Sequence, residues 1–89
     1  MSRNFTDEAF EEYVYWQNQD RKTLKRINKL IDDIARNGAD NGIGDPEPLK
    51  YKLSGYWSRR IDEKNRLIYR VDENGNIIID SCKGHYNKD

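Results

Sequence analysis

The sequence predicts an α+β fold, in which an N-terminal helical hairpin packs on one face of an antiparallel β-sheet. Two observations favour this class. Apolar residues recur at helical spacing between residues 6 and 37, and from residue 52 onward apolar and polar positions alternate, as in half-buried strands. The 89 residues are expected to form a single domain, 1–89, because a chain of this length supports only one modest core.

The first 37 residues predict a short edge strand and two helices. Residues 1–5 favour a brief edge strand that ends at Phe5. Thr6 is a good N-cap for a helix that runs to about Gln19. One face of this helix is expected to consist of Ala9, Phe10, Tyr13, Val14 and Gln17. Asp20 can cap a second helix that ends near Asn37, with an apolar stripe of Leu24, Ile27, Leu30, Ile31, Ile34 and Ala35.

The first half of the second helix carries five cations, mostly off the apolar stripe: Arg21, Lys22, Lys25, Arg26 and Lys29. Such a run is usually a solvated face. The alternative is a surface for an RNA backbone, because Lys and Arg neutralise phosphates. The net charge of zero argues against a general nucleic-acid coat. Residues 45–70 nevertheless hold seven cationic and four anionic side chains, which is compatible with a local anion site.

A loop is expected over residues 38–48, and it presents one constrained carboxylate. Asp45 and Glu47 each precede a proline, which disfavours the helical conformation at both positions. Pro46 also fixes the backbone just before Glu47. The carboxylate of Glu47 is therefore expected to project from a stiff, extended segment. The competing interpretation is an ordinary exposed loop glutamate.

Three consecutive strands follow, connected as an antiparallel meander. From Lys52 the period is two, and one face is expected to carry Leu53, Gly55, Trp57, Arg59 and Ile61. After a turn at residues 62–64, the apolar face continues with Leu67, Tyr69 and Val71. Asn74-Gly75 is a strong hairpin signal before a last strand over residues 76–82. The run of isoleucines at 77–79 suggests that this strand is covered on both faces.

The register of this meander places two arginines opposite each other. With a three-residue turn at 62–64, Trp57 is expected to face Tyr69 on the core side, and Arg60 to face Arg66 on the other side. Like charges in that arrangement are unfavourable unless the face receives an anion, and a phosphate accepts forked guanidinium groups well. Alternatively, both side chains extend into water or pair with Asp62 and Asp80.

His85, the single histidine, lies close to the end of the chain. A lone histidine there is usually incidental, but an imidazole that follows a strand next to the arginine face could transfer a proton near neutral pH. The neighbouring Tyr86 could stack on a base or bond a phosphate. One histidine and one cysteine offer too few nitrogen and sulfur ligands for a metal site, so neither a metal nor a cofactor is expected.

Cys82 is the single cysteine, so no internal disulfide is expected. A buried small side chain is the more ordinary role for it, and a reactive thiol is the alternative. No apolar run is long enough to cross a membrane, and the N-terminus lacks the signal-peptide pattern. A cytoplasmic protein with no membrane partner is expected.

Five segments taken together resemble the YoeB-type (Txe/YoeB) toxins of the RelE/ParE superfamily: EEYVYW at 11–16, PEPLK at 46–50, LSGYWSRRI at 53–61, NRLIYRV at 65–71 and GHY at 84–86. The resemblance extends from about Phe5 to Tyr86. It implies the RelE/ParE-like toxin fold, two helices on a twisted antiparallel sheet. It also implies a toxin of a type II toxin–antitoxin module, a ribosome-dependent endoribonuclease that cuts mRNA in the A site without a metal. The implied partners are a YefM-like antitoxin, the 70S ribosome with its mRNA, and a second copy in a homodimer.

The family's site residues match positions already singled out. The resemblance implies that Glu47 is the general base, that His85 is the general acid and that Arg66 stabilises charge on the phosphorus. It implies substrate contacts for Arg60 and Lys50, and an orienting role for Tyr86. Two alternatives share the fold, namely a noncatalytic ParE-like gyrase poison and a binding module that blocks the ribosome without cutting. A gyrase binder has no need for the acid–base pair.

Overall fold

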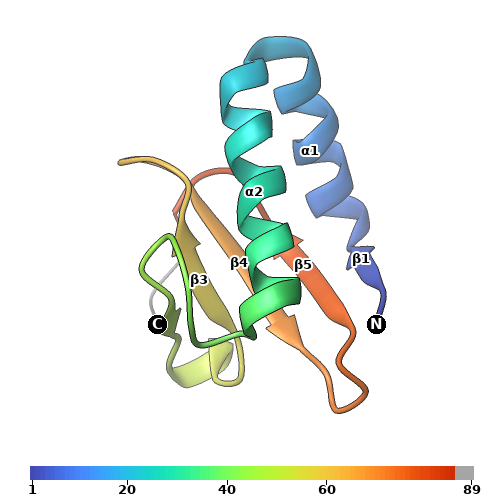
Figure 1. Ribbon diagram of the computed structural model, residues 1–89. Coiled ribbons are helices and arrows are strands. Elements are labelled where there is room, and N and C mark those ends of the chain that lie inside the picture. Colours follow the sequence, from blue (N-terminus) through green and yellow to red (C-terminus); the bar gives the residue numbers. More distant parts are fainter. Residues whose placement is uncertain (86–89) are drawn as a thin grey trace.

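The computed structural model describes residues 1–85 and consists of two antiparallel helices packed on one face of a five-stranded sheet (Figure 1). The helices are α1 (Asp7–Gln19) and α2 (Arg21–Asn37). The remaining elements are β1 (Arg3–Phe5), β2 (Glu47–Pro48), the 3₁₀ turn η1 (Tyr51–Leu53), β3 (Trp57–Arg60), β4 (Arg66–Val71) and β5 (Ile77–Ser81). The predicted α+β class with a helical hairpin on one face is confirmed.

The strand order is β1-β5-β4-β3-β2, and the sheet is mixed rather than wholly antiparallel. The predicted meander of β3, β4 and β5 is antiparallel, but the edge strand β1 pairs with β5 in parallel. A parallel pair requires a long crossover, which the helical hairpin and the three intervening strands supply. Thr6 N donates to Ile79 O at 3.0 Å, and Ile77 N donates to Ser2 O at 2.8 Å. These bonds fix β1 in register beside β5.

Side-chain caps define the two helices. Thr6 accepts a hydrogen bond from Ala9 N, and Asp20 accepts from the backbone amides at 22 and 23. Both predicted caps are confirmed. The predicted face of α1 is correct at Ala9 and Tyr13, which pack in the core, and wrong at Phe10 and Gln17, which are exposed. Trp16, which was not predicted on this face, also packs against the core.

The main core lies between the helices and the sheet. Its buried members come from α1, α2, β4, β5 and the residues that directly follow β3 and β5: Ala9, Ile27, Leu30, Ile31, Ile34, Ile61, Leu67, Tyr69, Ile77, Ile79 and Cys82. Ile78, which lies between the buried Ile77 and Ile79, is only half-buried. The expectation that both faces of β5 are covered is therefore wrong. The helices cover one face, and Ile78 points to the other.

The strand predicted from residue 52 begins later, at Trp57. Residues 51–53 form η1, which is closed by hydrogen bonds from Leu53 N to Lys50 O and from Ser54 N to Tyr51 O. Gly55 then adopts a φ of 95°, which a residue with a side chain rarely does, and the chain reverses into β3. Local turn bonds therefore override the period-two pattern before residue 57.

The predicted register of β3 and β4 is confirmed. Trp57 pairs with Tyr69, and Arg60 pairs with Arg66. The connecting turn is stabilised by Asp62, whose Oδ1 accepts hydrogen bonds from Lys64 N at 2.8 Å and Asn65 N at 2.7 Å. The β4–β5 ladder shifts its register between Ile68 and Tyr69, which pair with Ser81 and Ile79. Asp80 is consequently the extra residue of a bulge near the end of β5.

Candidate active site

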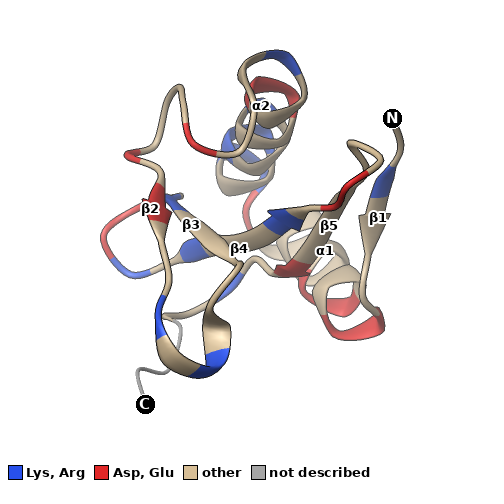
Figure 2. Cartoon of the chain, turned by 90° about the horizontal axis from the view of Figure 1, so that it is seen from below, with Lys and Arg blue, Asp and Glu red and all other residues tan. Residues whose placement is uncertain are grey.

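The face of the sheet opposite the helices brings three of the predicted site residues together. Glu47 in β2 pairs with Ser58 in β3, and two residues further along β3 Arg60 pairs with Arg66 in β4. Paired residues share a face, and so do residues two apart in a strand. Glu47, Arg60 and Arg66 therefore lie on one face, within three adjacent strands. Figure 2 shows the acidic β2 strand beside basic segments of β3 and β4.

The two arginines form a non-hydrogen-bonded pair of the antiparallel ladder. Arg60 N donates to Gly44 O at 2.7 Å on one side, and Arg66 N donates to Gly84 O at 3.0 Å on the other. Both amides therefore point away from the partner strand. Pairs of this type have the shorter Cα separation, about 4.5 Å, and the closer side chains. The fold thus places two permanently cationic side chains opposite each other, which is unfavourable in the absence of an anion.

Neither arginine side chain pairs directly with a carboxylate among residues 1–85. Arg66 Nη1 donates to two backbone carbonyls of the β3–β4 turn, Asp62 O at 2.6 Å and Asn65 O at 3.1 Å. Among residues 1–85, neither Arg60 nor Arg66 forms an ion pair, so the alternative of direct pairing with Asp62 and Asp80 is wrong. The charge of Arg66 nevertheless acts on the nearby Asp62 carboxylate. Arg60 is exposed. Within that part of the chain the two guanidinium groups retain donors for an anionic ligand.

Glu47 is exposed and its backbone is extended, as predicted, but residues 47–48 pair as the edge strand β2 rather than belonging to the expected loop. The loop before it is fixed by a buried arginine. The Arg59 side chain is fully buried on the helix-facing side of β3. Its Nη1 lies 2.6 Å from Asp33 Oδ2, and its Nε donates to Tyr69 Oη at 2.8 Å. Arg59 also donates to three carbonyls of the loop, those of Gly38, Asn41 and Ile43.

This buried network constrains residues 38–44, the loop that leads to Glu47. Tyr69 Oη donates to Ala39 O at 2.6 Å and so adds another contact to the same loop. Gly44 has a φ of 83°, and a Cβ built there would lie 2.8 Å from the Leu30 side chain. The hydrogen bond from Arg59 is the main cause of the lowered pKa of Asp33. Arg59 was not among the predicted site residues, although the alternation did place it on the core face.

Glycine 84 brings the C-terminal segment beside Arg66. Besides accepting the bond from Arg66 N, Gly84 donates its own amide to Asn65 Oδ1 at 2.7 Å. His85 follows directly and is exposed. The predicted acid is therefore attached to a backbone segment that pairs with the start of β4. Tyr86 lies outside the described residues.

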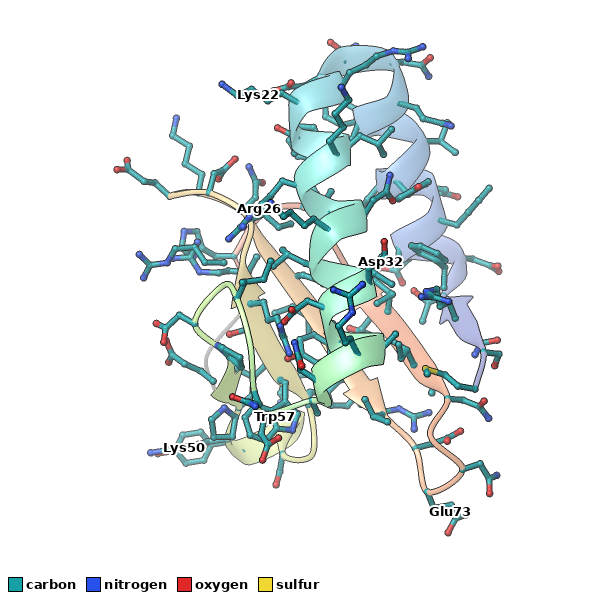
Figure 3. The ribbon with its side chains drawn as sticks, viewed as in Figure 1. Lys22, Arg26, Asp32, Lys50, Trp57 and Glu73 are labelled. Carbon is teal, nitrogen blue, oxygen red and sulfur yellow. The ribbon has the colours of Figure 1, made fainter. Side chains whose placement is uncertain are left out.

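Lys50 occupies a different position from the arginine pair. It is exposed and immediately precedes η1, and Figure 3 shows its side chain pointing outward at the lower end of the sheet. The same view places Arg26 on α2 near the opposite end, where Arg26 Nη2 donates to Arg60 O at 3.0 Å. Lys50 follows the edge strand β2 by two residues.

Residues 1–85 contain no group of three or more His, Cys, Asp or Glu side chains arranged to hold a metal ion. None of the helices in that range is long and apolar enough to span a membrane.

Comparison with known proteins identifies one family. Residues 5–86 match the family described as "YoeB-like toxin of bacterial type II toxin-antitoxin system". Toxin YoeB of Streptomyces coelicolor is 50% identical over 86 residues, which cover 97% of this chain and 100% of that protein.

Solved structures agree with this assignment. The YoeB chain in a heterotetrameric YoeB–YefM complex from Staphylococcus aureus superposes with a TM-score of 0.89 at 52% identity, covering 97% of this chain and 98% of that one. The YoeB dimer from the same organism gives a TM-score of 0.90 at 51% identity, with the same coverage of both chains.

Proposed function

Because the chain belongs to the YoeB-like toxins of bacterial type II toxin–antitoxin systems, we propose that it is a metal-independent endoribonuclease that cuts mRNA in the ribosomal A site and so stops translation. The observation that carries the proposal is the paired Arg60 and Arg66 on an open sheet face with a carboxylate on one side and a histidine-bearing segment on the other. Cations without a direct ion pair among residues 1–85 suit the charge that develops on a phosphoryl group.

The proposed reaction is an internal transfer within the messenger. Glu47 takes the proton from a ribose 2′-hydroxyl, and the 2′-oxygen attacks the adjacent phosphorus. The bond from phosphorus to the 5′-oxygen breaks, and His85 gives a proton to that leaving oxygen. The products are a 2′,3′-cyclic phosphate and a 5′-hydroxyl, and each proton-transfer residue contributes about 10²–10⁴-fold.

The cations stabilise charge in this reaction. Arg66 contacts the phosphoryl oxygens, Arg60 supports the same group from the facing strand, and Lys50 contacts the RNA next to β2. Tyr86 orients the substrate. The backbone bonds of Arg60 and Arg66 hold both residues before substrate arrives, which avoids reorganisation during the reaction.

The proposed binding partners of this protein are based on its family and on the solved structures of its relatives. A YefM-like antitoxin binds this toxin and restrains its activity, as the heterotetrameric YoeB–YefM complex suggests. A second copy forms a homodimer, in keeping with the YoeB dimer structure. The ribosome and its mRNA are the substrate assembly, and the site of action is the cytoplasm.

The test is primer extension on a defined mRNA programmed into purified 70S ribosomes. Wild-type protein should generate new 3′ ends at the A-site codon only when ribosomes are present, and His85→Ala should abolish most of this cleavage. A messenger with a single 2′-deoxy nucleotide at the cut position should be bound but not cut, since its nucleophile is missing. Cleavage of the deoxy substrate would overturn the proposed chemistry.

Two other results of the translation assay would favour one of the two alternative functions. Stalled ribosomes with an intact message would identify a module that blocks without cutting. Unaffected translation together with gyrase inhibition would identify a ParE-like poison.

A further inference from the structure

Three side chains from distant parts of the chain hold the backbone just before His85. Glu12 Oε1 accepts the amide of Cys82 at 2.7 Å, and Trp16 Nε1 donates to the carbonyl of Cys82 at 2.9 Å. Asn65 Oδ1 accepts the amide of Gly84 at 2.7 Å. The first two residues lie on α1, and the third precedes β4. We call these three residues the C-terminal anchor.

The anchor replaces strand pairing where β5 has ended. Both backbone polar groups of Cys82 are bonded to side chains, and the residue is fully buried. Glu12 itself is half-buried, and this desolvation is the main cause of its raised pKa. A carboxylate in that position is unfavourable unless it contributes a bond that the chain needs.

Apart from these bonds to the preceding residues, few contacts constrain the position of His85. Its side chain is exposed, it follows a glycine with a φ of 80°, and within residues 1–85 its ring makes no hydrogen bond. An exposed side chain that follows a glycine has few local constraints on its orientation. A general acid must be oriented to within a fraction of an ångström, and a misplacement of about 1 Å can cost 10²-fold in rate.

We infer that Glu12, Trp16 and Asn65 are positioning residues, which hold residues 82–84 so that His85 is presented next to Arg66. The inference rests on the proposed function for the role of His85 as the acid. It extends the site from the open sheet face to α1, on the other side of the sheet (Figure 1). A residue on that helix thereby controls the reaction without touching RNA.

The test compares three variants of the full-length protein. Glu12→Met removes the acceptor at similar length, Glu12→Gln keeps an acceptor oxygen, and Glu11→Met makes the same charge change at an exposed neighbour. Single-turnover cleavage and binding are both measured on mRNA-programmed ribosomes. Glu12→Met should cleave about 10- to 100-fold more slowly with unchanged binding. Glu12→Gln and Glu11→Met should remain close to wild type.

A coupling experiment separates positioning from general stability. In a His85→Ala background, Glu12→Met should slow cleavage no further, because the group that it positions is absent. Equal slowing in both backgrounds, or a failure of Glu12→Gln to restore the rate, would overturn the inference. If His85→Ala itself cleaves normally, the proposed acid role fails, whatever Glu12 does.

A measurement on the free protein does not depend on the reaction. ¹⁵N relaxation should give lower order parameters for the amides of residues 83–85 in Glu12→Met and in Trp16→Phe than in wild type, with helical amides unchanged. Trp16→Phe serves as a second variant, since it removes the N–H donor together with the five-membered ring of the indole and keeps a six-membered aromatic ring against the core. Unchanged order parameters in both variants would overturn the inference.

Discussion

Arg60 and Arg66 face each other across β3 and β4 with their backbone amides turned in opposite directions, toward Gly44 O and Gly84 O. One of these bonds reaches the loop before Glu47, and the other reaches the segment before His85. The pair of cations is therefore the point at which the two proton-transfer residues of the proposed reaction are tied to the sheet. This arrangement favours an anionic ligand at the expense of stability.

Removal of one cation should stabilise the free protein and weaken its activity. Arg60→Gln relieves the repulsion with Arg66, so the free energy of unfolding should rise by roughly 0.2–1 kcal/mol. Cleavage on ribosomes should become slower. Arg70→Gln is the matched control, because Arg70 faces Ile78 rather than a cation. Urea unfolding measures the first effect, and a less stable Arg60→Gln protein would contradict the argument.

The buried Arg59 should be a major determinant of stability. Arg59→Met leaves Asp33 and three loop carbonyls without their donor, and loss of one partner of a buried pair costs about 3–5 kcal/mol. Arg36→Met on the exposed end of α2 should change the free energy of unfolding by only about 0.5 kcal/mol. Chemical denaturation compares the two. Equal effects would show that the loop does not depend on Arg59.

Acid should destabilise the protein through Asp33. The folded-state pKa of Asp33 is lowered from 3.8, first by the hydrogen bond from Arg59. A depressed folded pKa contributes stability above the unfolded value, and this contribution is lost as the pH falls through the folded one. Urea midpoints measured below about pH 4 should therefore fall less steeply for Asp33→Asn than for wild type. Asp32→Asn, whose ion pair with Arg3 is exposed, should retain most of the wild-type slope.

Cys82 should be inert while the protein is folded. Burial raises the pKa of its thiol to about 12, and its Sγ contacts Ala9 O at 3.6 Å in the core. The thiolate is the reactive form, so a maleimide should label the native protein only as fast as the C-terminal segment opens. Protein in denaturing urea is the positive control. Rapid labelling of the folded state would show that the anchor of residues 82–84 is loose in solution.

Local sequence patterns were sufficient to predict much of the candidate site and of the elements that carry it. Thr6 and Asp20 cap the helices because capping depends on one side chain and the next turn. The prolines on both sides of Glu47 predict its extended backbone, because a proline restricts the conformation of its immediate neighbour in the chain. Alternation and turn length set the register of β3 and β4, since a slip of one residue would expose the apolar face. The facing arginines followed from that register alone.

The fold class, both helices, the register of the arginine pair and the family can be predicted from the amino-acid sequence, because each depends on neighbours in the chain or on motifs read in order. The parallel pairing of β1 with β5, the contacts of Arg59 with the loop before Glu47, and the bonds from Glu12 and Trp16 to the segment before His85 became visible in the folded structure. These contacts join residues as far apart in the sequence as Ser2 and Ile77. A hydrogen bond between such distant groups depends on how the whole chain packs, and no local pattern of residues encodes it.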